Sequence, residues 1–249
     1  MNCKEEKVAS RAVAWIPNGV TSLSIICGFL AIVLSEDPMK EFCCGLKSLE
    51  ICWILIGAAA VFDFLDGLVA RLLHATSAMG KELDSLCDLV SFGVAPSVML
   101  FQTLKSLCPM SWCLSWLSVA ICVFGALRLA KFNVDTRQTT SFIGLPIPAN
   151  AIFWIGFMAM LTYRGIQSEI VVGIIILAVS LLMVSGLPMF SFKLKGPMKI
   201  DRDNICRIIL IISAILFVVF LGVEGLMWTI VMYVLLSVVN RLSECIVKK

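Results

Sequence analysis

The chain alternates between long apolar runs and short polar connections, and this pattern dominates the sequence. A helix rises about 1.5 Å per residue, so about 20 apolar residues are needed to cross the ~30 Å hydrocarbon core of a membrane. The runs that are this long, or nearly so, are 17–35, 51–73, 84–104, 112–132, 149–163, 169–187, 206–222 and 225–240. We therefore expect an all-α fold, a membrane-embedded helical bundle with about eight transmembrane helices.

The connections between these runs are too short to form a second domain. The run at 149–163 follows Pro146 and Pro148, which makes its start the least sharply marked. Only Gly222-Val-Glu224-Gly225 separates the last two runs, which favours a tight turn at the membrane surface. We expect residues 1–249 to form one transmembrane domain.

Composition agrees with a membrane protein. Apolar residues make up 60% of the chain and charged residues 15%, whereas soluble domains are roughly half apolar and a quarter charged. The mean hydropathy is +0.99. The N-terminus mixes acidic and basic residues and leads into the first run, so no cleavable signal is expected. A net charge of +3 indicates membrane lipids as partners and gives no reason to expect nucleic acid.

Basic residues fall mainly on one side of the predicted bundle. That side carries Lys4, Lys7, Arg11, Arg71, Lys81, Arg128, Lys131, Arg137, Lys193, Lys195, Lys199, Arg202, Arg207, Arg241, Lys248 and Lys249. The opposite side carries only Lys40, Lys47, Lys105 and Arg164. Because basic residues are retained on the cytoplasmic side, we expect a multi-pass protein of the cytoplasmic membrane with both termini in the cytoplasm.

Four aspartates lie in and beside two of the apolar runs: Asp63, Asp66, Asp84 and Asp88. An ionised carboxylate near hydrocarbon costs several kcal/mol, and four close together repel one another. Mg²⁺ or Mn²⁺ would neutralise them, because both ions prefer oxygen ligands. Spacings of three and four place each pair on one helix face, so two helices can present both pairs to one cytoplasm-facing cavity. The aspartates therefore predict an enzyme with a site for two divalent ions.

The aspartates have two other interpretations. Helix packing accounts poorly for four carboxylates with only Arg71 and Lys81 close in sequence. A divalent-cation carrier is an alternative, because carboxylates inside membranes also mark ion pathways. However, a carrier gives no reason for Gly67, Ala70 and Gly80, small residues that let a backbone or a bulky ligand approach the helix.

These residues form a pattern that resembles the signature of the CDP-alcohol phosphotransferases, D-x2-D-G-x2-A-R-x8-G-x3-D-x3-D. The matching positions are Asp63, Asp66, Gly67, Ala70, Arg71, Gly80, Asp84 and Asp88. The resemblance implies that the first three aspartates bind metal, and that Asp88 is the base and completes the metal site. It also implies that Gly67, Ala70, Arg71 and Gly80 pack against the CDP group, and that the protein is a homodimer.

Residues beside the signature are further candidates for binding the donor. Pro17, Asn18 and Thr21 resemble the opening of the family's first helix, which borders the nucleotide, although such residues are also ordinary at helix starts. Arg71 and Ser77 lie on the link between the two aspartate pairs and are candidates for contacting phosphate oxygens.

Later segments resemble the membrane-embedded phosphatidylserine synthases of this family. They are 91–96, 128–133, 142–149, 183–185 and 190–193, and the resemblance runs from Pro17 to about Lys195. It implies transfer of the phosphatidyl group of CDP-diacylglycerol to L-serine, with release of CMP. Glycerol 3-phosphate, inositol phosphate and other amino alcohols remain alternative acceptors. A phosphorylated acceptor calls for a denser cationic pocket than this chain offers.

Arg128 and Lys131 are the candidates for binding serine. The serine carboxylate requires a cation near the cytoplasmic end of the site, and either residue can supply one. Both residues would equally serve to anchor a helix at the membrane interface. Arg137 suits either the acceptor or a lipid phosphate.

The remaining residues with reactive or aromatic side chains have simpler interpretations. The 11 cysteines contain no CxxC pair, so neither zinc nor a disulfide framework is expected. His74, the 1 histidine, is expected to be a solvated loop residue. Trp15, Trp53 and Trp112 fall near the ends of predicted spans, as is typical of an interfacial aromatic belt.

Overall fold

A computed structural model of the chain describes residues 3–43, 45–74, 77–108, 112–134, 142–166, 168–189 and 202–247. Its α-helices are α1 (Cys3–Leu34), α2 (Ser48–Leu72), α3 (Ala78–Asp88), α4 (Ala95–Leu107), α5 (Trp112–Trp116), α6 (Val119–Val134), α7 (Ile147–Arg164), α8 (Glu169–Val184), α9 (Arg202–Leu221) and α10 (Gly225–Val247). A π-helical segment, η1 (Leu89–Val94), joins α3 to α4, and a 3-10 turn, η3 (Gly222–Glu224), joins α9 to α10. The short strands are β1 (Glu41–Cys43), β2 (Leu46–Lys47), β3 (Phe142–Ile143) and β4 (Pro188–Met189).

The protein is a helical membrane protein, and every predicted apolar run coincides with helix. Among the described residues, 5 helical stretches are long and apolar enough to cross a membrane: Trp15–Leu34, Ser48–Leu72, Ala78–Leu107, Cys113–Val134 and Asn204–Arg241. The last stretch contains both α9 and α10, and the predicted turn between them is confirmed as η3. Helix α8 is a shorter apolar helix.

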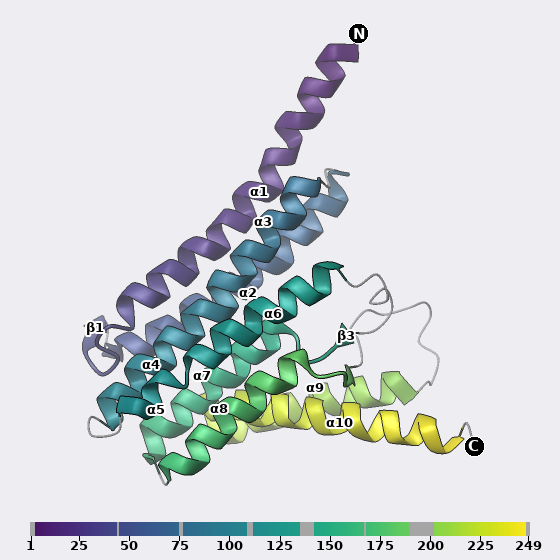
Figure 1. Cartoon of the computed structure of the whole chain (residues 1–249). Coiled ribbons are helices and arrows are strands. Elements are labelled where there is room, and N and C mark those ends of the chain that lie inside the picture. The colour runs from purple at the N-terminus through teal and green to yellow at the C-terminus, as the bar shows by residue number, and fades with distance from the viewer. Residues whose placement is uncertain are drawn as a thin grey trace.

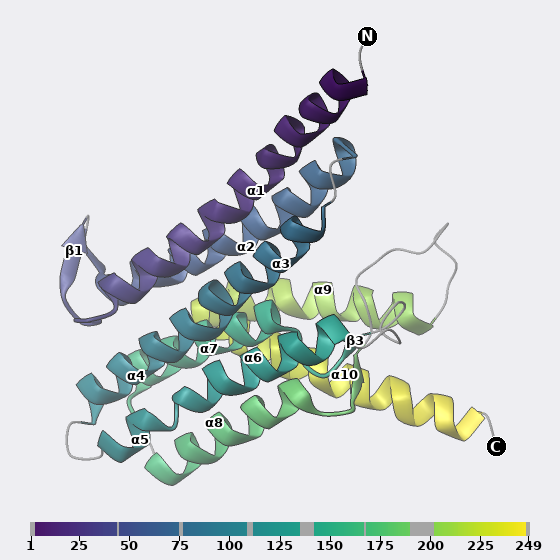
Figure 2. The same cartoon turned by 45° about the horizontal axis from the view of Figure 1, so that its top comes forward.

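The helices form one bundle around α7 (Figure 1). Helix α1 packs along α2 and α3, α6 packs against α8, and α10 packs against α7 and α9. Trp154, Phe157 and Met158 of α7 are fully buried. Figure 2 shows α9 and α10 on the side of the bundle away from α1. The described N- and C-terminal ends lie at one end of the bundle, and the β1–β2 hairpin lies at the other (Figures 1 and 2).

Helix α1 begins earlier than the sequence predicted. The first apolar run was placed at 17–35 with Pro17 at the helix start, whereas the helix runs from Cys3 and contains Pro17 in its interior. Proline lacks the N–H that would bond to the carbonyl four residues earlier, so it removes one hydrogen bond at this point. The helix continues through it, and the Pro17 carbonyl accepts a 3.0 Å hydrogen bond from Thr21 Oγ1.

A short antiparallel pairing joins two connections that are far apart in sequence. Strand β3 pairs with β4, with Phe142 opposite Met189 and Ile143 opposite Pro188. The next residue, Gly144, has a φ of +77°, and a Cβ there would lie 2.2 Å from the carbonyl oxygen of Met183. Only glycine fits this approach to the end of α8. The all-α prediction did not include this pairing, which is too short to give a strand pattern.

The π-helical segment η1 follows Asp88 directly and packs against α1. Ser91 Oγ donates a 2.9 Å hydrogen bond to the carbonyl of Ser24. A Cβ on Gly28 would lie 2.8 Å from the Cα of Ser91, so α1 can approach this closely only at a glycine. Single turns of π-helix are rare and occur frequently at functional sites. The segment therefore fixes how the helix that carries Asp84 and Asp88 lies against α1.

Candidate active site

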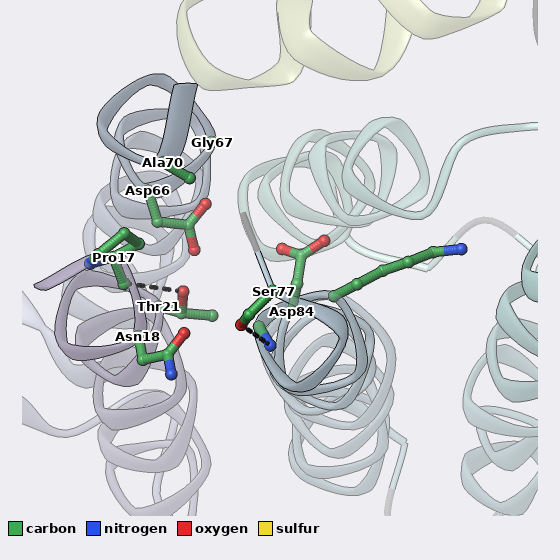
Figure 3. Close-up of a pocket in the computed structure, with 10 residues that line it drawn as sticks. Pro17, Asn18, Thr21, Asp66, Gly67, Ala70, Ser77 and Asp84 are labelled. Carbon is green, nitrogen blue, oxygen red and sulfur yellow. Dashed lines mark hydrogen bonds between the residues drawn. The ribbon is translucent and has the colours of Figure 1, made fainter. Parts of the chain in front are cut away.

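Helices α1, α2 and α3 enclose a cavity of about 230 Å³ at the end of the bundle that holds the termini. We call it the aspartate cavity. Its walls are Pro17, Asn18, Thr21, Asp66, Gly67, Ala70, Ser77, Gly80, Lys81 and Asp84. Figure 3 shows α1 and α2 on one side of the cavity and α3 on the other. All of these residues except Lys81 were predicted from the sequence to belong to the site.

Three of the predicted aspartates lie close together, and two of them, Asp66 and Asp84, line this cavity. One carboxylate oxygen from each of Asp63, Asp66 and Asp84 lies within 4.8 Å of the others, and Asp66 and Asp84 point toward each other in Figure 3. Asp66 is buried, and its Oδ2 has no hydrogen-bond partner among the described residues. Hard divalent cations bind carboxylate oxygens at about 2.0–2.6 Å, so one ion can contact oxygens spaced this way. The three carboxylates therefore fit a divalent cation.

Asp88 occupies a different position from the other three aspartates. Its carboxyl contacts that of Asp63, which also contacts Asp84. Asp88 is not one of the three clustered carboxylates, and, like Asp63, it is not part of the cavity wall. It also interacts electrostatically with Arg128 of α6. Asp88 is thus coupled both to the clustered carboxylates and to a buried cation.

Arg128 is the buried cation nearest to this cluster of carboxylates. Its side chain is 7% exposed, and its guanidinium carbon lies 5.8 Å from the centre of the Phe132 ring. Nε of Arg128 has no hydrogen-bond partner among the described residues. Arginine is almost never buried without a compensating partner. The structure therefore leaves one buried donor of this guanidinium without a partner among the described residues.

Lys131 lies one turn further along α6 and has a different environment. Its side chain is exposed, and Nζ donates a 3.3 Å hydrogen bond to the carbonyl of Val184 at the end of α8. Asn133, which the sequence did not single out, donates a 3.1 Å hydrogen bond to Ser85 Oγ. That bond joins α6 to the turn of α3 between Asp84 and Asp88. The contact depends on how α3 and α6 cross, which no spacing in the sequence reveals.

The link between α2 and α3 contributes less than expected to the cavity. Arg71 is exposed, its Nε donates a 2.8 Å hydrogen bond to the Gly67 carbonyl, and it does not line the cavity. Ser77 lines the cavity as the N-cap of α3, where its Oγ accepts a 2.9 Å hydrogen bond from the Gly80 N–H. Lys81, which the sequence analysis assigned only to membrane topology, lines the same wall.

The two glycines of the signature have different surroundings. A Cβ on Gly80 would lie 3.1 Å from both Asn18 Oδ1 and Ser77 Oγ, so glycine there allows α3 to approach α1. A Cβ on Gly67 would meet no atom within 4 Å, although Gly67 lines the cavity. Protein packing therefore gives no reason for the missing side chain at Gly67, whereas room for a ligand does.

Some of the predicted residues lie outside the part of the chain that the structure describes. Arg137, and the segment 190–193 that entered the family resemblance, are among them. The side chains of Lys4, Lys7 and Arg11 are not described either. Among the described residues, the predicted site residues lie on helices α1, α2, α3 and α6, with Ser77 at the N-cap of α3.

A comparison with protein families matches residues 14–185 to the model described as CDP-alcohol phosphatidyltransferase. Several curated proteins are similar to this chain, and each of the following is named CDP-diacylglycerol--serine O-phosphatidyltransferase. The protein of Mycobacterium leprae is 38% identical over 186 residues, which cover 70% of this chain and 57% of that protein. The protein of Methanocaldococcus jannaschii is 38% identical over 178 residues, covering 71% of this chain and 74% of that protein. The protein of Bacillus subtilis is 35% identical over 179 residues, covering 72% and 92% respectively.

Proposed function

The chain belongs to the CDP-alcohol phosphatidyltransferase family, and on that premise we propose that it transfers the phosphatidyl group of CDP-diacylglycerol to L-serine, releasing CMP. The observation that carries this proposal is the arrangement of the four aspartates around the aspartate cavity. Asp63, Asp66 and Asp84 cluster together, Asp66 and Asp84 line the cavity, and Asp88 interacts electrostatically with Arg128. The names of relatives from bacteria and an archaeon agree with serine as the acceptor.

The aspartate cavity is the proposed binding site of the CDP group. Gly67 and Ala70 leave room along α2, while Asn18 and Thr21 of α1 offer hydrogen-bonding groups. Lys81 and the N-terminus of α3 are proposed to face the pyrophosphate, because a cation and a helix N-terminus both favour phosphate oxygens. Arg71 would contribute charge near the rim. The diacylglycerol tails would remain in the surrounding hydrocarbon.

Asp63, Asp66 and Asp84 are the proposed ligands of Mg²⁺ or Mn²⁺, and we propose that Asp88 contributes to a second ion. A bound divalent cation would neutralise the carboxylates and polarise the phosphate oxygens of the donor. The unpartnered Oδ2 of buried Asp66 supports this assignment. Four carboxylates this close repel one another unless a cation or proton lies between them.

Asp88 and Arg128 are proposed to handle the acceptor. The serine hydroxyl attacks the β-phosphorus, so its oxygen–phosphorus bond forms while the bond to the CMP oxygen breaks. Asp88 accepts the hydroxyl proton, and CMP carries away the electron pair of the broken bond. Arg128 holds the serine carboxylate through its guanidinium, whose Nε has no partner among the described residues. Lys131 is exposed, and we propose that it chiefly anchors the end of α8.

Serine is favoured over the alternative acceptors by the number of cations near Asp88. Glycerol 3-phosphate or inositol phosphate would bring a second dianionic phosphate close to the aspartates. Among the described residues, Arg128 is the one buried cation that could balance this charge. A divalent-cation carrier is a remote second candidate. It offers no explanation for the open wall at Gly67.

The architecture beyond the site is also part of the proposal. We propose eight membrane crossings in a single domain spanning 1–249, with both termini and the aspartate cavity on the cytoplasmic side of the cell membrane. A homodimer is proposed from the family resemblance alone. The accessibility of Cys3 and Cys245 to a membrane-impermeant thiol reagent, in a chain whose 9 other cysteines are replaced by serine, would test the orientation, because cytoplasmic ends should react only after permeabilisation.

Replacing Asp88 by Asn tests the proposed chemistry. General bases contribute about 10²–10⁴-fold to a rate, so we expect Asp88→Asn to lower CMP release by at least about 100-fold while CDP-diacylglycerol still binds. The same measurements on Asp37→Asn, in the loop far from the cavity, provide the control. Undiminished CMP release from Asp88→Asn would remove Asp88 as the base.

A further inference from the structure

A second cavity, of about 580 Å³, lies between α2 and α7 and does not belong to the proposed reaction. We call it the lateral cavity. Its volume falls within the range typical of ligand sites, about 300–1,000 Å³. Along α2 its wall runs from Glu50 to Ala60, and along α7 it reaches Tyr163. The described parts of α2 and α7 are thus partly separated by space rather than by packed side chains.

The polar side chains of the lateral cavity are confined to one end. Glu50, Trp53 and Tyr163 line the end near the start of α2, on the side of the β1–β2 hairpin. Ala60 and Phe92 line the opposite, apolar end. Ala60 lies one turn before Asp63, so the apolar end is the one that points toward the aspartates. An amphipathic ligand would therefore place its polar part away from the aspartates.

Two of the three polar side chains already have partners, and the third does not. Glu50 accepts hydrogen bonds from the Lys47 N–H at 2.9 Å and from the Tyr163 hydroxyl at 3.0 Å. Trp53 packs edge-on against Tyr163, with ring centres 6.3 Å apart. Its side chain is 7% exposed, and Nε1 has no hydrogen-bond partner among the described residues. Since a buried N–H without an acceptor is unfavourable, a ligand with an acceptor oxygen would suit this end.

We propose that the lateral cavity binds one acyl chain of a glycerolipid from the leaflet opposite the aspartates, with its ester carbonyl accepting a hydrogen bond from Trp53 Nε1. Glu50 and Ala60 are ten positions apart, which spans about 15 Å of helix, and this equals half of the ~30 Å hydrocarbon core. One leaflet's acyl chain therefore fits the cavity lengthwise. The carboxylate of Glu50 disfavours an anionic headgroup at the entrance, so the lipid carries no net negative charge.

The donor lipid of the reaction is a poor fit for this cavity. Its phosphates must lie at the aspartates, which places its ester groups near the apolar end rather than near Trp53. Trp53 and Asp63 are ten residues apart on α2, or about 15 Å along the helix. The proposal therefore does not depend on which reaction the aspartate cavity supports.

Native mass spectrometry of the purified chain, titrated with phosphatidylethanolamine or phosphatidylglycerol of identical acyl chains, tests the proposal. We expect one phosphatidylethanolamine per chain, bound more tightly than phosphatidylglycerol. Trp53→Phe should weaken binding about two- to tenfold, because it removes a single hydrogen bond. Trp228→Phe, on α10 outside the cavity, is the matched control. Gly57→Leu should abolish binding, because Gly57 lines the cavity and a Cβ there would meet no protein atom within 4 Å, whereas Val61→Leu should not.

A second measurement on the unaltered chain locates the lipid. Phosphatidylcholine with a diazirine at the end of one acyl chain should crosslink near Ala60 and Phe92, and phosphatidylcholine with a diazirine near the ester should crosslink near Trp53. The proposal would be overturned if the crosslinks lie elsewhere, or if Trp53→Phe binds the lipid as tightly as the unaltered chain does. It would also be overturned if phosphatidylglycerol binds as tightly as phosphatidylethanolamine. A change of oligomeric state in Gly57→Leu would also overturn it, because a second copy of the chain would then occupy the cavity.

Discussion

Substitution of Gly67 distinguishes most clearly between a role in helix packing and a role in binding the donor lipid. It lies in the interior of α2, it lines the aspartate cavity, and a Cβ there would meet no atom within 4 Å. Glycine destabilises a helix interior by about 0.5–1 kcal/mol relative to alanine. Gly67→Ala should therefore stabilise the ligand-free protein by about that amount.

The same substitution should weaken donor binding. Filling space that a ligand needs costs about 1–3 kcal/mol, which corresponds to roughly 5- to 150-fold in affinity. Gly67→Leu should lie at or beyond the upper limit, because it places four carbons in a cavity of about 230 Å³. Stability and affinity should thus change in opposite directions, and the loss of affinity should grow with side-chain size.

Thermal unfolding in detergent without substrate measures the first effect, and equilibrium binding of CDP-diacylglycerol measures the second. For a chain of this size, 1 kcal/mol corresponds to about 2–4 °C in Tm. Val61→Leu, at a 57% exposed position of the same helix, controls for added bulk outside the cavity. A lower Tm with unchanged donor affinity in Gly67→Ala would refute the reasoning, because packing would then explain the glycine.

Four further predictions concern the rest of the site. Arg128→Lys should raise the KM for serine about tenfold or more while leaving the KM for CDP-diacylglycerol unchanged, because lysine cannot reproduce the planar guanidinium; equal effects on both would assign Arg128 to packing. Removing divalent ions with EDTA should stop CMP release, and Mg²⁺ or Mn²⁺ should restore it; full activity in metal-free buffer would contradict the proposed ligands. Mg²⁺ should raise the Tm of the wild-type chain but not that of Asp66→Asn, as measured by thermal unfolding. Gly28→Ala should lower the stability by about 1–3 kcal/mol, because its Cβ would lie 2.8 Å from Ser91 Cα, and an unchanged Tm would show that α1 shifts freely.

Most of the fold followed from the hydrophobic pattern, because each helix of this bundle needs an apolar surface along most of its length. The run at 84–104 coincides with a helical stretch that begins at Ala78 and includes the π-helical turn. That turn could not be predicted, because a single extra residue in one turn leaves no mark on the periodicity. The early start of α1 was missed because Pro17 was taken as a helix start, whereas it lies inside the helix.

The aspartates were predictable because their spacing places them on helix faces, and because charge in hydrocarbon demands an explanation. The side chains around them were less predictable. Lys81 lines the cavity, although the sequence indicated only a role in membrane orientation. Arg71 was expected to contact the ligand, but its side chain donates a hydrogen bond to the Gly67 carbonyl. The contact of Asn133 with Ser85 depends on the crossing of α3 and α6. Such details depend on helix packing and side-chain rotamers, which cannot be deduced from residue spacing alone.

The lateral cavity had no counterpart in the sequence analysis. Trp53 was interpreted as part of an interfacial belt, and its burial inside the protein was not predicted. Its neighbours Glu50 and Tyr163 are 113 positions apart in the chain. Their meeting depends on how α2 and α7 approach each other.

CMP release by the purified protein, measured with CDP-diacylglycerol, Mn²⁺ and one acceptor at a time, tests the central claim most directly. The acceptors are L-serine, glycerol 3-phosphate, inositol phosphate and ethanolamine. We expect CMP and phosphatidylserine with serine alone. CMP with a different acceptor would contradict serine as the substrate while leaving the family chemistry in place. No CMP with any acceptor, from protein shown to be folded, would contradict the proposed transferase activity itself.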